Sequence, residues 1–452
     1  MRSITRSLLL LLLLWPSLLL AQAAPAPAAK DPATTATDLI DRLAKGDFQG
    51  AASNFDEPMR AAAPPEKLSE IWTALQSQLG PYKRPVGVRT EKQGLYRVVF
   101  VTAEFERSTV DFRVAIEESG KIGGLFVVPP QTMGQAGAAY SPPAYVKQDA
   151  FREREVTIDA GGTGEWALPG TLAVPVGPGP FPAVVLVHGS GPNDRDETVE
   201  GNKPFRDLAW GLASRGVAVL RYEKRTRQHG AKLGAVKNFT VRQETIDDAL
   251  AAAALLRHTE GIDPKRVFVL GHSLGGLLIP RIGQGDPLLA GLIVLAGATR
   301  PLEDIILEQV SYIAAADGTV TDAEKKQIES LRQEVAKVKA LKPGDTGTVL
   351  GAPASYWLDL RGYNPPEVAK SLKQPLLILQ GERDYQVTMD NFAAWKKALA
   401  GRPNVTLTTY PKLNHLFIEG EGKSTPAEYE KPGHVSEAVI ADITDWINRL
   451  KR

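Results

Sequence analysis

Residues 267–278 read Val-Phe-Val-Leu-Gly-His-Ser-Leu-Gly-Gly-Leu-Leu, and this stretch decides the fold. The four apolar residues at its start, two of them β-branched valines, are typical of a strand buried on both faces. The apolar run at its end can begin a helix. A serine on such a sharp turn needs strained backbone angles and neighbours without side chains, which Gly271 and Gly275 provide. The pattern therefore predicts that Ser273 is exposed above the edge of a sheet.

The expected helix directs free N–H groups and the positive end of its dipole toward the Ser273 hydroxyl. A nucleophile beside donors that stabilise an anion is the arrangement that acyl transfer needs. An ordinary glycine-rich strand-to-helix turn is the alternative interpretation. The strand before the motif, Gly276 and the apolar run after it favour the nucleophile.

The composition indicates a globular protein of about two domains. A length of 452 residues exceeds one average domain, and 43% hydrophobic with 23% charged residues is typical of soluble proteins. A formal charge of +1 and no basic tract give no indication of a nucleic-acid partner. The chain has 0 cysteines, which excludes disulfides, thiolate metal sites and a cysteine lipid anchor. We expect no metal and no other cofactor.

Residues 1–23 are predicted to be a secretory signal peptide. Arg2 and Arg6 give a positive start, an apolar core follows, and Ala21-Gln22-Ala23 is a small-x-small cleavage site. The alternative is an uncleaved membrane anchor, but the apolar run is shorter than the ~20 residues that a spanning helix needs. We therefore expect export to a bacterial periplasm or medium, no stable membrane anchor, and a disordered Ala/Pro-rich leader over residues 24–33.

Residues 34–128 are predicted to form a small α+β domain. No acid/base cluster, phosphate loop or metal-ligand spacing occurs in it, so packing, homodimerisation and substrate presentation are its alternative roles. A linker rich in Pro, Gly and Ala is expected over residues 129–147. The expected elements are helices at 37–44 and 65–79 and strands at 95–105, 109–116 and 122–128.

Residues 148–452 alternate between strand and helix patterns, which predicts a mostly parallel sheet covered by helices on both faces. Residues 300–373 interrupt the alternation and are expected to be a helical cap, whose charge-rich helix is most simply a solvated face. Expected strands lie at 155–158, 168–174, 183–187, 217–222, 267–270, 292–295, 376–379 and 405–409. Expected helices lie at 205–215, 241–256, 305–315, 321–341, 390–399 and 435–450.

His415 is the predicted general base among the 6 histidines. It lies in the loop after the last expected strand, and loops at the carboxyl ends of parallel strands form the site in open α/β sheets. His272 lies inside the serine turn, and we expect its side chain to point away from the hydroxyl. Asp384 is the predicted acid, because it follows a strand and stands between Ser273 and His415 in the chain.

Other carboxylates remain as alternatives to Asp384, namely Glu382, Asp359 and, with less support, Asp390. The oxyanion hole is predicted to use the backbone N–H groups of Leu274 and Ser190, with Gly189 or Gly191 as alternatives to Ser190. Gly189, Gly191 and His272 are predicted to contact substrate.

Four charged residues near the glycine loop have two interpretations. They could steer an anionic substrate, or they could form ion pairs that hold the loop in shape, and we favour the second. These residues are Arg195, Asp196, Lys203 and Arg225.

The chain resembles α/β-hydrolases of the dienelactone-hydrolase and serine-aminopeptidase-like branch, in particular bacterial two-domain esterases with a small N-terminal α+β domain. The resemblance covers residues 156–450 and is carried by 188–196 (HGSGPNDRD), 203–209 (KPFRDLA), 220–225 (LRYEKR), the Ser273 motif and 381–384 (GERD). It implies a Ser-His-Asp triad, no metal and an acyl-enzyme intermediate.

The leading hypothesis is an exported serine carboxylesterase that acts on a small-molecule ester. A serine aminopeptidase or thioesterase could use the same triad, although no acidic pocket for a substrate amine is evident. A binding protein of hydrolase fold without catalytic activity is the third hypothesis, and no residue of the triad is missing to support it.

Overall fold

The structure is a computed structural model of the 452-residue chain, and it describes residues 31–93, 96–128, 140–234 and 236–450. The predicted signal peptide lies outside these residues, as do most of the predicted leader and residues 129–139 of the predicted linker. Contacts within the chain divide it into two units, residues 1–130 and 131–452.

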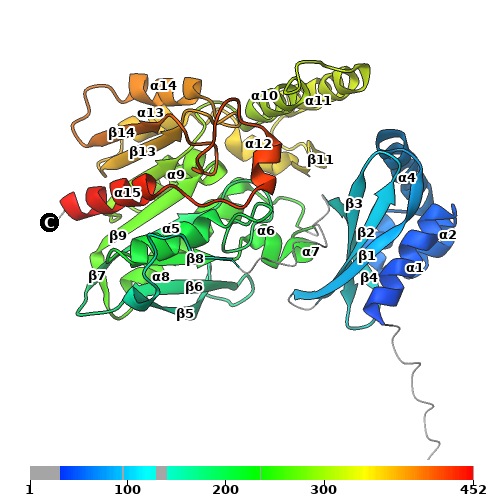
Figure 1. The fold of residues 1–452 in the computed structure, drawn as a ribbon, viewed down its shortest axis with the longest axis horizontal. Helices are drawn as coiled ribbons and strands as arrows, with labels where there is room; N and C mark the ends of the chain where they lie inside the picture. The colour runs from blue at the N-terminus through cyan, green and yellow to red at the C-terminus, as the bar shows by residue number, and fades with distance from the viewer. Residues whose placement is uncertain (1–30, 94–95, 129–139, 235, 451–452) are drawn as a thin grey trace, which may run out of the picture. The chain divides into compact units, whose positions relative to one another are not determined.

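The N-terminal unit contains four antiparallel strands in the order β1-β2-β3-β4 among its described residues. Its helices pack on one face of this sheet (Figure 1). The prediction of a small α+β unit is therefore confirmed. The elements are α1 (Pro32–Ala44), α2 (Phe48–Ala52), α3 (Glu57–Ala62), α4 (Pro65–Leu79), β1 (Tyr82–Gln93), β2 (Tyr96–Phe105), β3 (Thr109–Glu117) and β4 (Ile122–Val128).

This unit differs from the expected one at α1 and β1, and it contains two short helices, α2 and α3, that were not predicted. Helix α1 begins at Pro32, inside the expected disordered leader, because the Asp31 side chain accepts a hydrogen bond from the Thr34 N–H and Pro32 suits the first helical position. Strand β1 was not predicted, because it pairs only with β2 and contains Pro85 and Gly87, so its exposed residues show no hydrophobic pattern.

The C-terminal unit is built on one large sheet, ordered β14-β13-β10-β9-β7-β8-β6-β5 within the described chain. Its strands are β5 (Phe151–Ile158), β6 (Leu168–Pro175), β7 (Phe181–Val187), β8 (Ala218–Tyr222), β9 (Ile262–His272), β10 (Gly291–Leu295), β13 (Leu376–Gly381) and β14 (Val405–Tyr410). Pairing is parallel from β8 to β14, whereas β5 and β6 add an antiparallel edge.

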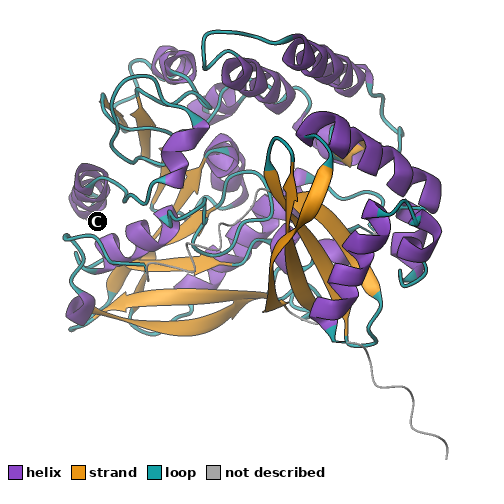
Figure 2. Ribbon diagram, turned by 45° about the vertical axis from the view of Figure 1, so that its right-hand side comes forward, coloured by secondary structure: helices purple, strands orange, loops and turns teal. Residues whose placement is uncertain are grey.

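Helices cover both faces of this sheet, as Figures 1 and 2 show and as the sequence predicted. One buried cluster joins the sheet to α8 (Asp247–Arg257), α9 (Leu274–Gly285) and α14 (Met389–Ala398). The other joins it to α5 (Pro204–Ala213) and α15 (Glu437–Arg449). The unit also contains short helical segments. These are 3₁₀ turns at Gln148–Ala150 and Pro426–Glu430, the helices α6 (Arg225–Gln228) and α7 (Gly230–Leu233), and a π-helical turn at Arg242–Ile246.

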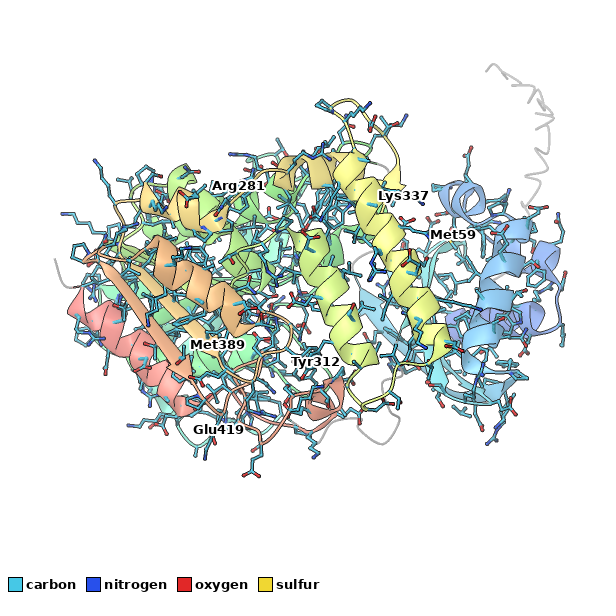
Figure 3. The ribbon with its side chains drawn as sticks, turned by 90° about the horizontal axis from the view of Figure 1, so that it is seen from above. Met59, Arg281, Tyr312, Lys337, Met389 and Glu419 are labelled. Atoms are coloured by element: carbon cyan, nitrogen blue, oxygen red, sulfur yellow. The ribbon has the colours of Figure 1, made fainter. Side chains whose placement is uncertain are left out.

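The cap lies between β10 and β13, within the range that the sequence indicated. Its two long helices, α10 (Leu302–Ala314) and α11 (Asp322–Ala340), lie side by side and carry Tyr312 and Lys337 (Figure 3). On α11 only Val335 and Val338 are buried, so its charged residues form a solvated face. The smaller cap elements were not predicted because each is short: β11 (Thr348–Val349), β12 (Ala352–Pro353), α12 (Ala354–Leu360) and α13 (Pro365–Lys370).

The last part of the predicted linker packs on the C-terminal unit. The Tyr145 hydroxyl donates to the Val435 carbonyl oxygen over 2.7 Å, and the Lys147 N–H donates to the Ser214 hydroxyl over 2.8 Å. The Tyr140 hydroxyl donates to Asp207. These three contacts make residues 140–147 part of the C-terminal unit.

Candidate active site

Ser273 occupies a strained turn between β9 and α9. Its φ of 54° and ψ of −114° are rare for a residue with a side chain, and its N–H donates to the Leu295 carbonyl oxygen over 2.9 Å. A Cβ atom added to Gly271 would lie 2.3 Å from the Gly275 carbonyl oxygen. A Cβ atom added to Gly275 would lie 2.3 Å from the Val187 carbonyl oxygen. The two glycines are therefore required by close backbone packing.

Asp384 and His415 come together at the carboxyl edge of the sheet. Asp384 follows β13 and His415 follows β14, so the parallel pairing of these strands places both loops side by side. The distance from His415 Nδ1 to Asp384 Oδ2 is 2.7 Å, and both residues are buried. The backbone carbonyl oxygen of His415 lies 2.9 Å from Nε2 of His272, the residue before Ser273.

The Asp384 carboxylate is held by several donors besides His415. Its Oδ1 accepts hydrogen bonds from the N–H groups of Gln386 and Val387 over 2.7 and 2.9 Å. Its Oδ2 accepts a further bond from Gln380 Nε2 over 3.1 Å. These contacts fix the carboxylate oxygen that faces the imidazole, which is what an acid of a catalytic triad requires.

The alternative carboxylates make other contacts. Glu382 Oε1 accepts from the Thr409 hydroxyl over 2.7 Å, and Asp359 pairs with Arg281 over 2.7 Å. Asp390 lies in the first turn of α14. The structure brings none of these three to a hydrogen bond with His415 among the described residues.

The glycine loop after β7 lies directly against the serine. A Cβ atom added to Gly189 would lie 3.2 Å from Ser273 Cβ and 3.7 Å from its Oγ. The Gly189 N–H already donates to Glu197 Oε1 over 2.5 Å, so it is not available to a substrate oxygen. Within the described residues the Ser190 N–H has no protein acceptor. Of the predicted loop donors, Ser190 therefore fits an oxyanion hole better than Gly189.

His272 is not placed to contact substrate through its ring nitrogens, contrary to expectation. Its Nε2 lies 2.9 Å from the His415 carbonyl oxygen, and its Nδ1 forms an ion pair with Glu197 Oε2 over 2.9 Å. The His272 side chain is buried. Glu197 was missed by the sequence analysis, because nothing in the local pattern marks it as a partner of a distant histidine.

The remaining histidines have structural contacts. Burial lowers the pKa of His188 to about 4, so its ring is neutral at neutral pH. His229 Nε2 and His258 Nδ1 each lie 2.9 Å from a backbone carbonyl oxygen, those of Ala167 and Ala254. His434 Nδ1 lies 3.1 Å from Asp207.

The charged residues beside the loop form ion pairs, as the favoured interpretation predicted. Arg195 contacts Glu155 and Glu223 over 2.7 and 2.8 Å. Asp196 is surrounded by three cations, Lys203, Arg206 and Arg221. Arg225 pairs with Asp248.

A cavity of about 430 Å³ lies between the cap and the loop after β10. Thr299, just before the cap, and Pro301, at its start, line it together with Lys339, Trp357 and Tyr363 of the cap. None of Ser273, Asp384 and His415 lines it. The Tyr363 hydroxyl donates to the Leu277 carbonyl oxygen over 2.8 Å, about one helical turn from the serine.

The described residues contain no group of three or more His, Cys, Asp or Glu side chains placed to hold a metal ion. Within residues 31–93, 96–128, 140–234 and 236–450, no helix has the length and apolar character needed to cross a membrane.

The comparisons with known proteins agree with this architecture. Residues 184–430 match the family described as "Alpha/beta hydrolase family", and residues 36–125 match the one described as "Protein of unknown function (DUF3887)". Esterase EstD of Thermotoga maritima is 39% identical over 409 residues, covering 90% of this chain and 93% of that protein. The chain belongs to the alpha/beta hydrolase family, and the resemblance inferred from its motifs is confirmed.

Solved structures that match parts of the chain include Est1E from Butyrivibrio proteoclasticus and a puromycin-hydrolyzing peptidase of Mycobacterium tuberculosis. Est1E is 17% identical with a TM-score of 0.43, and the match covers 66% of this chain and 98% of Est1E. The peptidase is 17% identical with a TM-score of 0.43, and the match covers 82% of this chain and 48% of the peptidase.

Proposed function

We propose that this protein is a serine carboxylesterase in which Ser273 is the nucleophile, His415 the general base and Asp384 the acid that orients the base. The observation that carries the proposal is the 2.7 Å contact between His415 Nδ1 and Asp384 Oδ2 beside a strained serine turn. Membership in the hydrolase family and 39% identity to an esterase support ester bonds as the substrate class.

The proposed reaction has two steps. His415 Nε2 takes the proton of Ser273 while Oγ attacks the ester carbonyl carbon, and the N–H groups of Leu274 and Ser190 stabilise the oxyanion. The alcohol leaves with the proton from His415, which gives an acyl-enzyme. His415 then activates a water molecule, whose attack releases the carboxylic acid and restores the Ser273 hydroxyl.

A peptidase that recognises a free amino group would need a carboxylate without a partner near the serine. The buried carboxylates next to the glycine loop are engaged instead, since Asp196 is surrounded by cations and Glu197 pairs with His272. The arrangement of charges at the glycine loop therefore favours an ester over an aminoacyl substrate. A thioester would use the same machinery, and the assay below separates it.

The decisive assay compares chromogenic esters of increasing acyl length, a thioester series and aminoacyl anilides, using the chain from Ala24 onward. We expect ester turnover that Ser273→Ala abolishes, together with covalent labelling of the wild-type serine by a fluorophosphonate. Turnover of anilides alone would replace the esterase by a peptidase, and turnover of thioesters alone would replace it by a thioesterase. Silence on every panel, with no labelling, would favour a binding protein of hydrolase fold.

We also propose that the protein is exported and that residues 1–23 are removed. The positive start, apolar core and Ala21-Gln22-Ala23 site support this proposal. N-terminal sequencing of protein from a bacterial periplasm tests it, and an intact Met1 would contradict it. Homodimerisation through residues 34–128 stays a prediction. Sedimentation of the chain with and without those residues tests it by measuring the molecular mass in solution.

A further inference from the structure

The glycine loop beside Ser273 is held by two buried charged side chains. The Gly189 N–H donates to Glu197 Oε1 over 2.5 Å, and the Gly189 carbonyl oxygen accepts from Lys224 Nζ over 2.7 Å. Both side chains are almost fully buried, with 3% exposure for Glu197 and 2% for Lys224. Burying a charge is costly unless it is paired and hydrogen-bonded, so these two contacts are not incidental.

The contact from Lys224, together with a longer one from Asn193 Nδ2 to the same oxygen over 3.2 Å, fixes the direction of the Ser190 N–H. The Gly189 carbonyl and the Ser190 N–H belong to the same planar trans peptide, so they point in opposite directions. A cation on the carbonyl side therefore turns the N–H toward the other side of the peptide. It also polarises the peptide group, because hydrogen-bonded groups in a medium of low dielectric strengthen one another.

Glu197 fixes the preceding peptide and connects it to the other catalytic loops. Its second oxygen lies 2.9 Å from His272 Nδ1, and His272 Nε2 lies 2.9 Å from the His415 carbonyl oxygen. A carbonyl oxygen only accepts, so His272 Nε2 must carry a proton. Glu197 thus links the glycine loop, the serine turn and the loop of the base.

The backbone of Glu197 supports a specific role for this side chain. Its φ of 51° lies in the left-handed region that residues with side chains seldom adopt. Such conformations persist where surrounding contacts hold them, and they cluster at functional sites.

Lys224 is connected in turn to the cap. Its Nζ lies 3.3 Å from Glu244 Oε1, and Glu244 Oε2 accepts from the Tyr356 hydroxyl over 2.8 Å. Glu244 lies on the π-helical turn Arg242–Ile246, a distortion that is frequent at functional sites. Tyr356 lies on α12 of the cap.

We propose that Lys224 and Glu197 are positioning residues that hold, as a clamp, the peptide groups on either side of Gly189. They thereby aim the Ser190 N–H at the oxyanion that forms when Ser273 attacks the substrate carbonyl. The inference rests on the proposed esterase mechanism and adds to it the residues that preorganise the oxyanion hole. Neither side chain touches substrate; both act through the backbone of the glycine loop.

The experiment measures kcat and KM for a chromogenic ester, and the inhibition constant of a trifluoromethyl ketone, whose adduct with Ser273 carries an oxyanion. For Lys224→Met we expect kcat to fall at least tenfold, KM to stay within threefold, and ketone affinity to fall in parallel with kcat/KM. Removal of a whole oxyanion donor lowers kcat by about 10²–10³-fold. A donor that is only misdirected should therefore lower kcat by that factor or by less.

Further variants separate positioning from simple loss of stability. Lys224→Met combined with Glu244→Gln removes both partners of the buried pair, and it should show the same kinetic defect without an unpaired carboxylate. Glu197→Leu should lower kcat at least tenfold. Glu197→Gln should stay within threefold, because its oxygen still accepts from Gly189 and its amide can donate to a neutral His272.

Asp207→Asn is the matched control. Asp207 is also a buried carboxylate that pairs with a histidine, His434, and accepts a backbone N–H, that of Val435, over 2.9 Å. It makes no contact with the glycine loop among the described residues. We expect Asp207→Asn to lower the melting temperature while kcat/KM and ketone affinity stay at wild-type values.

The outcomes for the clamp and for the esterase are distinct. Wild-type turnover that Ser273→Ala does not reduce would overturn the esterase mechanism, and the clamp with it. Turnover that depends on Ser273 but is unchanged in Lys224→Met, its double variant and Glu197→Leu would overturn the clamp alone. Equal defects in Glu197→Gln and Glu197→Leu, without loss of ketone affinity, would also overturn it.

Discussion

His415 Nδ1 and Asp384 Oδ2 lie 2.7 Å apart, on loops that follow two neighbouring parallel strands. Because Asp384 already accepts two backbone N–H groups with its other oxygen, the carboxylate cannot rotate without losing them. The imidazole is therefore held with its Nε2 free to face a reacting group. A triad needs this orientation more than it needs the charge alone.

Asp384→Asn should lower kcat by about 10³–10⁴ while the fold is kept. The amide oxygen can still accept from Gln386 and Val387, but its NH₂ group would then face His415 Nδ1 and force the proton onto Nε2. That tautomer cannot take the proton of Ser273. Steady-state kinetics on a chromogenic ester measure the loss.

Glu382→Gln is the control for this substitution, because Glu382 is two residues away and pairs with Thr409 instead. It should leave kcat within a factor of two of the wild type. A large loss in Glu382→Gln and none in Asp384→Asn would reverse the assignment of the acid.

Gly275→Ala should impair both stability and turnover. The added Cβ would lie 2.3 Å from the Val187 carbonyl oxygen, and this backbone leads directly into the glycine loop, so it must move. We expect a loss of about 1–3 kcal/mol in the free energy of unfolding, the usual cost of overpacking, and a fall in kcat. Chemical denaturation and ester kinetics measure the two effects.

Gly285→Ala is the matched control at the other end of the same helix. Its added Cβ would lie 2.9 Å from Leu250 Cδ1, the tip of a flexible side chain that can turn aside. Turnover should be unchanged, and stability should change by less than about 1 kcal/mol. If both variants behave alike, close backbone packing at the serine turn is not what requires Gly275.

The sequence was informative wherever one local pattern determined the structure. Strands β7, β9, β10 and β13 were predicted because buried parallel strands read as continuous apolar runs. Strand β1 was missed because an exposed edge strand carries no such run. The short helices α12 and α13 were missed because 7 and 6 residues hold too few turns to show a helical period.

The same distinction holds at the site. Ser273 has a local motif, and Asp384 and His415 follow from chain order and from their places after strands. Glu197 has neither advantage, and Lys224 follows β8 but has no motif that assigns it a role. Their partners, His272 and Glu244, are far away in sequence, so their roles depend on contacts that only the folded chain makes.

The pH dependence of stability should reveal the Glu197–His272 ion pair. Burial disfavours the charge on His272, but the Glu197 carboxylate outweighs it and raises the His272 pKa above 6.5. Burial likewise opposes ionisation of Glu197, yet His272 lowers the Glu197 pKa below 4.5. Asp384 adds to the first shift and His188 to the second.

The sign of the effect follows from these two directions. A raised histidine pKa stabilises the fold below the unfolded value of 6.5, and this stabilisation is lost as pH rises through the folded value. A lowered carboxyl pKa stabilises above 4.5, and this is lost as pH falls through the folded value. The difference in melting temperature between wild type and Glu197→Gln should therefore be largest between 4.5 and 6.5. A difference that grows toward alkaline pH would contradict the pair.

Truncation should show where the C-terminal unit begins. Tyr140 packs its ring 5.4 Å from that of Trp210, and Tyr145 donates to Val435, so residues 140–147 belong to the packed unit. A fragment of residues 131–452 should be active. A fragment of residues 148–452 should be less stable by about 2–5 kcal/mol, since it loses two partly buried aromatic side chains and their hydrogen bonds.

Tyr145→Phe in the longer fragment isolates one part of this loss. The ring stays and only the hydrogen bond to Val435 is removed, so the free energy of unfolding should fall by about 1 kcal/mol. Denaturant titration of the three proteins at one pH gives the comparison. Equal midpoints for the fragments beginning at 131 and 148 would mean that residues 140–147 contribute no stability, and the boundary of the unit would then lie after them.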